Sequence, residues 1–346
     1  MTRFLRDAVV FLVCWLLFAV LGTTALYTTV ELPMAHYERE EALQKLALLR
    51  QLDQVDTVFV GSSRVYGHID PIRFDEGRGG VSVNAGSISL LPPRSNDFLD
   101  AAVAARPDAQ LWVVELLALA LVGENWKNDA NVRSLTVDRG RDVLDYVRTV
   151  PLSVGTRRQY QTGYAKLAGY KLLGFGSARA LGLLRAPPPT SDPWRPEVVA
   201  RRGWISLEHD QAHHIAPAAL RAAQQQAAER KATAAGGRGK GGALADPPVG
   251  FVDAVVRRGE ALRAAGKTVV YFVPPRSHPD SVAILAHQQH VLEEHGFRVL
   301  NFDDAARYPS LFDAEAILDT SHFNDEGARR FTDLLRSELG AAGVLP

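Results

Sequence analysis

Short apolar segments that alternate with helix-like segments constrain the fold of this chain more than any other feature. Five segments have the length and apolar composition of buried strands: residues 57–60, 81–84, 111–115, 268–273 and 298–302. Helical periodicity marks four further segments: residues 96–105, 251–265, 281–295 and 325–339. Apolar strands that alternate with helices are typical of a parallel sheet covered on both faces. The expected fold class is therefore α/β, a three-layer α/β/α sandwich with a parallel sheet.

The alternation breaks after the third strand, and the gap is too long for a single crossover helix. We interpret residues 121–249 as a large helical insertion, which divides the core into residues 55–120 and residues 250–346. Within the insertion, glycines cluster at 236–242, but no strand enters this run and no Gly-Lys-Ser/Thr ends it. We therefore expect a flexible surface loop there and not a phosphate-binding loop.

The amino-terminal segment has the character of a membrane anchor. Residues 8–30 contain no charged side chain, and Arg3 and Arg6 precede them. This run exceeds both the about 20 residues that cross a bilayer and the about 7–15 apolar residues of a signal peptide. We therefore predict an uncleaved transmembrane helix at residues 1–30, with a cleaved signal peptide as the alternative. The two arginines favour a cytoplasmic N-terminus. The predicted protein is single-pass in the cell (inner or plasma) membrane, with a stalk helix at 31–54 and a periplasmic or extracellular C-terminal domain.

Composition excludes several classes of protein. Lys plus Arg and Asp plus Glu both number 39, so the formal net charge is zero and nothing favours nucleic acid. The single cysteine, Cys14, excludes an intrachain disulfide and a cysteine-based metal site. Glu208, His209, His213 and His214 form a local cluster with no further ligand in a fixed position, so a solvated patch is expected. We predict no metal and no cofactor.

Ser63, Asp319 and His322 are the candidate catalytic residues. Ser63 directly follows the first strand, and the carboxyl ends of parallel strands are where ligands bind. Asp319 and His322 lie three residues apart before the last helix, so one short turn can present both. A serine nucleophile needs a base and a group that orients the base, and these residues supply both. The alternatives are that Ser63 is an ordinary turn serine and that Asp319 caps the last helix.

Two motifs resemble the blocks of the SGNH (GDSL-type) hydrolases. Val60-Gly61-Ser62-Ser63 resembles the first block, in which Gly-Asp-Ser follows the first strand, with a serine in place of the aspartate. Asp319-Thr320-Ser321-His322-Phe323-Asn324 resembles the last block, Asp-x-x-His-Pro-Asn, with a phenylalanine in place of the proline. The resemblance covers roughly residues 55–120 and 250–343. It implies that Ser63 is the nucleophile, His322 the base and Asp319 its orienting partner.

The middle blocks depart from that family. The second block is Asn-x-x-x-Ser-Gly, and Asn84-Ala85-Gly86-Ser87-Ile88-Ser89 places Ser89 at the glycine whose N–H helps to form the oxyanion hole. The third block has an asparagine after the third strand, and residues 114–119 contain none. One oxyanion donor is therefore missing or comes from elsewhere, and the loss of such a donor typically costs about a hundredfold or more in turnover. The oxyanion candidates are the backbone N–H groups of Ser63 and Ser89. Asn84 and Arg64 are further oxyanion or substrate candidates, although Arg64 is also read as a salt-bridge or surface arginine.

The departures and the expected anchor are similar to a membrane-anchored subgroup of SGNH-like proteins, those of teichoic acid D-alanylation and of alginate and cellulose O-acetylation. The residues that carry this resemblance are Gly61-Ser62-Ser63-Arg64-Val65-Tyr66 and Ile69-Asp70-Pro71. The resemblance implies an extracytoplasmic O-acyltransferase or acylesterase that acts on a cell-surface polysaccharide or other envelope polymer, beside a membrane-bound O-acyltransferase partner. The alternative is a non-catalytic adaptor that docks the membrane acyltransferase and binds the polymer.

Overall fold

A computed structural model describes most of the chain outside its middle third. The described residues are 2–29, 33–88, 90, 94–117, 196–208, 217–235, 251–275, 279–345 and five isolated positions between 154 and 165. They form two compact units. One unit, here called the sheet unit, comprises Glu41–Leu119 and Trp194–Pro346, and the other comprises Met1–Glu40 and Ala120–Pro193. The predicted insertion at 121–249 is thus divided between the two units, and its glycine run at 236–242 lies outside the described residues.

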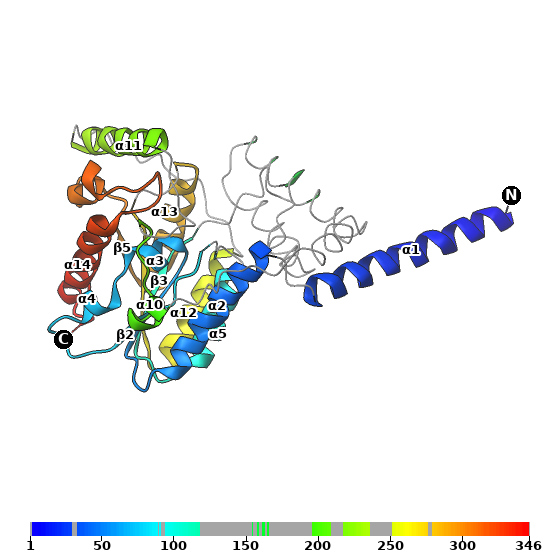
Figure 1. The fold of residues 1–346 in the computed structure, drawn as a ribbon, viewed down its shortest axis with the longest axis horizontal. Coiled ribbons are helices and arrows are strands. Elements are labelled where there is room, and N and C mark those ends of the chain that lie inside the picture. Colours follow the sequence, from blue (N-terminus) through cyan, green and yellow to red (C-terminus); the bar gives the residue numbers. More distant parts are fainter. Residues whose placement is uncertain are drawn as a thin grey trace. The chain divides into compact units, whose positions relative to one another are not determined.

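The centre of the sheet unit is a five-stranded parallel sheet (Figure 1). Its strands are β1 (Thr57–Val60), β2 (Ser82–Asn84), β3 (Leu111–Glu115), β4 (Thr268–Val273) and β5 (Arg298–Asn301). They follow the order β2-β1-β3-β4-β5, and every pairing is parallel. The prediction of an α/β fold with a parallel sheet is confirmed, and the strands differ from the expected ones by a single residue at β2 and at β5.

Helices follow the strands closely in the chain. Their bounds are α3 (Ser63–His68), α4 (Pro71–Asp75), α5 (Arg94–Ala105), α10 (Pro196–Ala200), α11 (Pro217–Ala235), α12 (Phe251–Ala264), α13 (Pro279–Glu294) and α14 (Asp325–Ala341), with 3₁₀ turns η1 (Pro309–Phe312) and η2 (Ala314–Ala316). The four longer helices predicted from periodicity are α5, α12, α13 and α14. The short helices α3 and α4 were not predicted, because five or six residues carry no periodic pattern.

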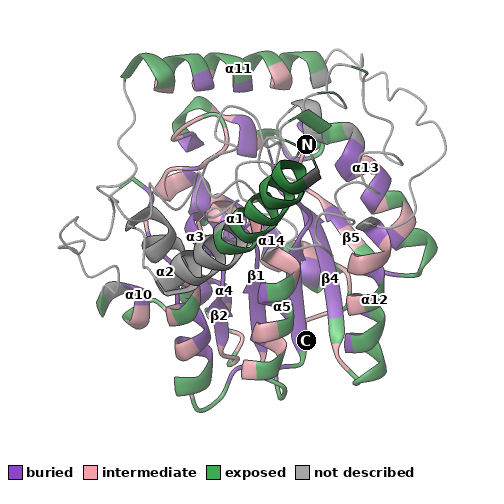
Figure 2. Ribbon diagram, turned by 90° about the vertical axis from the view of Figure 1, so that its right-hand side faces the viewer, coloured by how far each residue is buried: buried purple, intermediate pink, exposed green. Residues whose placement is uncertain are grey.

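Both faces of the sheet are covered, which explains why β1, β3 and β4 are mostly apolar and buried. Val58 and Val60 pack on one side with residues of α5, α12 and α13, whereas Phe59 packs on the other with α3, α4 and α14. Figure 1 places α4 and α14 on one side of the strands and α5 and α12 on the other. In Figure 2 the strands are buried and the outer faces of the helices are exposed. This arrangement leaves the carboxyl edge of the strands to the loops that carry the candidate site.

Residues 2–29 form a helix, α1 (Thr2–Thr29), as the anchor prediction required. Among the helices of the described residues, none combines the length and the apolar character that a bilayer crossing needs. The described side chains of α1 between positions 3 and 18 are almost all exposed. The membrane anchor thus stays a prediction from the uncharged run at residues 8–30.

The expected stalk is a helix, α2 (Pro33–Gln51), but its second half is part of the core. Leu46 and Leu49 are buried in the same cluster as Val58 of β1. Lys45 is also buried, and its ammonium donates hydrogen bonds to the backbone carbonyls of Asn84 and Gly203. Apolar residues three apart on this helix thus pack in the core of the sheet unit. The interpretation of residues 31–54 as a juxtamembrane stalk stays a prediction.

Lys45 gives the sheet unit a pH-dependent stability. Burial lowers the pKa of Lys45 to about 7, although Glu41 one turn earlier on the helix opposes the shift. An unfolded lysine keeps its proton up to about pH 10, so between these values the unfolded chain binds the extra proton. The free energy of unfolding is therefore expected to rise from about pH 7 to about pH 10, by a few kcal/mol from this residue. Chemical denaturation across this range should give a smaller slope for Lys45→Met, and parallel slopes would contradict the assignment.

Candidate active site

Ser63 is held at the sharp turn between β1 and α3. Ser62 is the N-cap of α3, and its hydroxyl accepts a hydrogen bond of 3.3 Å from the backbone N–H of Arg64. Ser63 is the first residue of the helix and is half-buried. Its backbone N–H belongs to the first-turn donors that a helix leaves without an intrahelical partner. The turn thus presents a hydroxyl and a backbone donor from the same residue at the carboxyl edge of the sheet.

The structure brings Ser63, His322 and Asp319 into one hydrogen-bonded chain, as predicted. The Ser63 Oγ lies 2.8 Å from His322 Nε2, and His322 Nδ1 lies 2.7 Å from Asp319 Oδ2. The side chains of His322 and Asp319 are 14% and 21% exposed. These contacts are those of a nucleophile, its general base and the carboxylate that orients the base. The arrangement can therefore deprotonate Ser63 as it attacks an electrophile.

The loop before α14 builds the base from local contacts. Asp319 Oδ1 accepts hydrogen bonds from the backbone N–H groups of Ser321 and His322, at 2.7 and 2.8 Å. The other oxygen of Asp319 remains for the imidazole. Asn324, and not Asp319, is the N-cap of α14, since its side chain accepts from the N–H of Gly327 at 3.0 Å. The sequence left open whether Asp319 orients His322 or caps the last helix. In the structure Asp319 contacts His322, and Asn324 caps the helix.

His68 is a neighbour of the base that the sequence analysis missed. It is fully buried at the end of α3, and its ring lies edge-on to that of His322 at a centroid distance of 5.8 Å. Its Nε2 accepts a hydrogen bond of 3.0 Å from the backbone N–H of Phe323. His68 therefore fixes the backbone directly after His322. A histidine inside a short helix carries no sequence signal for this role, because the contact spans 255 residues of the chain.

Removing the acceptor at position 68 is expected to destabilise the protein. His68→Phe leaves the buried N–H of Phe323 without a partner, and such a loss costs about 1–3 kcal/mol. Guanidinium denaturation measures the change in the free energy of unfolding. His68→Gln is the matched control, since its amide oxygen can take the place of Nε2, and it should recover part of the loss. Equal stability of His68→Phe and the wild type would contradict the assigned role.

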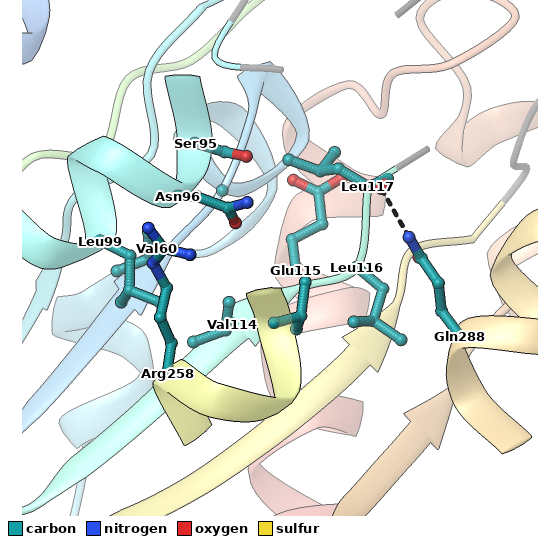
Figure 3. A pocket seen from close by; sticks show the side chains of 12 residues that line it. Val60, Ser95, Asn96, Leu99, Val114, Glu115, Leu116, Leu117, Arg258 and Gln288 are labelled. Atoms are coloured by element: carbon teal, nitrogen blue, oxygen red, sulfur yellow. Dashed lines mark hydrogen bonds between the residues drawn. The ribbon is translucent and has the colours of Figure 1, made fainter. Parts of the chain in front are cut away.

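Arg64 and Glu115 form an ion pair beside the nucleophile. The Nε of Arg64 lies 2.8 Å from Glu115 Oε1, so of the two readings of Arg64 the structure shows the salt bridge. Glu115 ends β3, where the SGNH blocks place an asparagine shortly after the strand. Its side chain lines a small cavity together with Leu99 and Gln288, as Figure 3 shows.

Asn84 and Ser89 are the two candidates from the motif that resembles the second block, and the structure describes the first of them. Asn84 is fully buried, and its amide donates to the carbonyls of Val65 and Ile69 at 2.6 and 2.7 Å, while its oxygen accepts from the N–H of Gly86 at 2.9 Å. Its side chain thus anchors α3, the helix that carries the nucleophile, to the end of β2. Ser89 lies outside the described residues. Of the backbone oxyanion donors considered from the sequence, the described part of the chain contains the Ser63 N–H.

Within the described ranges, no group of three His, Cys, Asp or Glu side chains could hold a metal ion. Of the local histidine cluster, Glu208 is described and its carboxylate accepts a bond of 3.3 Å from the N–H of Asp325, beside the start of α14. His209, His213 and His214 lie outside the described residues.

Searches against protein-family models, curated proteins and solved structures returned no match for this chain.

Proposed function

We propose that this protein is an SGNH-like serine O-acyltransferase or acylesterase that acts outside the cytoplasm on a cell-surface polysaccharide. The observation that carries the proposal is the continuous chain of hydrogen bonds from Ser63 Oγ through His322 to Asp319. Two segments of the chain supply this hydrogen-bonded chain, and Ser63 and His322 are 259 residues apart. An arrangement in the order nucleophile, base and carboxylate supports a catalytic role more than a chance contact. The reaction class that such a chain serves is acyl transfer through a covalent intermediate.

In the first half of the proposed reaction, Ser63 Oγ attacks the carbonyl carbon of a donor ester. His322 Nε2 takes the hydroxyl proton as the new C–O bond forms. The carbonyl oxygen becomes an oxyanion, which the Ser63 N–H is placed to stabilise. The tetrahedral species then breaks its bond to the leaving alcohol, and His322 returns the proton to that alcohol. The product is an acyl ester of Ser63.

In the second half, a hydroxyl of the polysaccharide or a water molecule attacks the acyl-enzyme. His322 removes the proton of the attacking group and then returns it to Ser63 Oγ as the acyl–serine bond breaks. Asp319 accepts a hydrogen bond from the Nδ1–H group throughout, so the imidazole keeps the tautomer in which Nε2 is the base. The same residues serve hydrolysis and transfer, and the acceptor decides between them.

Transfer with a partner is favoured over fast independent hydrolysis. Glu115 stands near the place of the third-block asparagine, and an ionised carboxylate cannot donate a hydrogen bond to an oxyanion. The site would therefore lack one of the usual donors and be a weak free-standing esterase. The missing donor and the resemblance to O-acetylation and D-alanylation proteins together favour a protein that transfers acyl groups with a membrane-bound O-acyltransferase as its partner. The uncharged run at residues 8–30 supports a location at the membrane surface.

The missing donor also favours the second candidate, a non-catalytic adaptor that docks the membrane acyltransferase and binds polymer. An adaptor has no need for the short contacts between Ser63, His322 and Asp319. The two candidates make opposite predictions for the nucleophile, so a single substitution separates them.

Complementation of a deletion strain tests the proposal. We expect the wild-type gene and the exposed-serine control Ser337→Ala to restore alkali-labile acyl groups on the surface polysaccharide, measured by NMR of the purified polymer. Ser63→Ala should not restore them, although immunoblotting should find it at the wild-type level. Full restoration by Ser63→Ala would instead support the adaptor.

A further inference from the structure

Glu115 is a buried carboxylate beside the nucleophile, and the proposed triad does not use it. Its side chain is fully buried, and that of its partner Arg64 is 16% exposed. Glu115 Oε2 accepts from the backbone N–H of Ser62 at 2.6 Å and from the Ser62 hydroxyl at 2.9 Å. The carboxylate therefore binds the residues on both sides of Ser63 in the chain.

The turn is shaped to admit this carboxylate. Val60 pairs with Val114 in the sheet, so Gly61 and Glu115 follow directly at neighbouring strand ends. A Cβ at position 61 would lie 2.4 Å from Glu115 Oε2 and 2.7 Å from Glu115 Cβ. Real Cβ atoms do not approach other atoms so closely, so a side chain at position 61 would displace Glu115. The absence of a side chain at Gly61 thus leaves the space that the Glu115 carboxylate occupies.

The contacts form a chain that ends on the first turn of α3. The Ser62 hydroxyl has one proton, which it donates to Glu115, and its lone pairs remain to accept from the N–H of Arg64. Glu115 thereby sets the direction of the hydroxyl that caps the helix on which Ser63 lies. Hydrogen bonds to an ionised partner are about twice as strong as neutral ones, so this link is stiffer than an ordinary cap.

The charge of the pair matters as well as its geometry. A tetrahedral acyl intermediate is negatively charged, and a bare carboxylate nearby would oppose it. The guanidinium of Arg64 compensates the charge of Glu115 at 2.8 Å. Conversely, either partner alone would leave an uncompensated buried charge next to the nucleophile.

We infer that Glu115 and Arg64 are a positioning pair for the nucleophile, which fix the turn of Ser63 through Ser62 and hold that turn electrically neutral. As far as it concerns reaction rate, the inference rests on the proposed acyl-transfer function. The side chains of the pair contact each other and Ser62, so its effect is on the placement of Ser63.

The test uses the full-length protein, purified in detergent, with Glu115→Gln, Arg64→Gln, Arg64→Lys and the Glu115→Gln/Arg64→Gln double variant. The control is Asp333→Asn, which breaks the Arg73–Asp333 ion pair between α4 and α14. Two quantities are measured for each protein: the rate of covalent labelling by a fluorophosphonate, and hydrogen exchange of the amides of residues 61–66 by mass spectrometry. The second measurement needs no enzymatic activity.

We expect Glu115→Gln and Arg64→Gln to label ~10- to 100-fold more slowly, which is the loss of one charge-assisted hydrogen bond expressed as a rate. Their turn amides should exchange faster than those of the wild type and of Asp333→Asn. Arg64→Lys keeps the cation and should recover much of the rate, a rescue that a merely space-filling role does not give. The double variant should lose less than the product of the two single losses, because it leaves no unpaired charge.

The outcomes separate this inference from the proposed function. Wild-type labelling and exchange in Glu115→Gln overturn the positioning role, even if Ser63 itself labels. Faster exchange in Glu115→Gln together with an unlabelled wild type supports the pair and refutes the proposed function. If Glu115→Gln does not fold, Ser62→Ala replaces it, because it removes the hydroxyl link and keeps the ion pair. Wild-type rate and exchange in Ser62→Ala would overturn the inference.

Discussion

Replacing Ser63 with alanine is expected to abolish hydrolysis of a small activated ester such as p-nitrophenyl acetate by the purified protein. The Ser63 Oγ is the atom that lies 2.8 Å from His322 Nε2, and alanine removes it. Loss of a triad nucleophile typically lowers turnover by about 10⁶-fold, so the rate should fall to the background of the buffer. The measurement is release of p-nitrophenol over time at a saturating ester concentration.

The fold of this variant should not change. Ser63 is half-buried at the first position of α3, where alanine is a good helix former, so the free energy of unfolding should change by less than about 1 kcal/mol. Ser337→Ala, an exposed serine on α14, is the matched control and should retain full activity. Turnover by Ser63→Ala at the wild-type rate would show that another group is the nucleophile.

Asp319→Asn is expected to lower the turnover number for the same ester by about 10³- to 10⁴-fold. The asparagine oxygen can still accept from the N–H groups of Ser321 and His322, so the loop should keep its shape. Its amide nitrogen, however, then faces His322 Nδ1 and donates to it. The imidazole is thereby held in the tautomer that places the proton on Nε2, where it cannot accept from Ser63.

The affinity for substrate should change little in this variant, because Asp319 is directed at the base. Steady-state kinetics at several ester concentrations separate the turnover number from KM. A fall in stability is not expected, and thermal unfolding of Asp319→Asn beside the wild type checks this. Activity within tenfold of the wild type would contradict the orienting role of Asp319.

The fold could be predicted from the sequence because it depends on contiguous patterns. The central strands β1, β3 and β4 are mostly apolar and buried, since both faces of the sheet are covered, whereas β4 and β5 each begin at an exposed residue. The part that helix α2 takes in the core was not predicted. Its charged residues favoured a stalk, whereas Glu41 and Lys45 are buried and bonded to backbone groups of the sheet unit. A sequence shows which residues are charged, but it does not show which distant backbone groups will pair with a charged side chain when it is buried.

The triad was predictable because each of its motifs is local. Ser63 follows a strand directly, and Asp319 and His322 share one turn. The supporting residues were not predictable, because their roles depend on contacts between distant segments. Glu115 meets Ser62 across 53 residues, and Asn84 meets the carbonyl of Val65 across 19. Asn84 was a candidate from its motif, although not for this contact, and Glu115 was noticed only where the expected asparagine is absent.

The most direct test of the central claim is to locate the adduct that a fluorophosphonate forms on the full-length protein. The labelled protein is digested, and the modified peptide is sequenced by mass spectrometry, with His322→Ala treated in parallel. The proposed function predicts one phosphonyl adduct on the wild type, on Ser63, and none on His322→Ala. An adduct on a different residue, or none on a folded wild-type protein, would contradict an activated Ser63 and leave the adaptor as the better account.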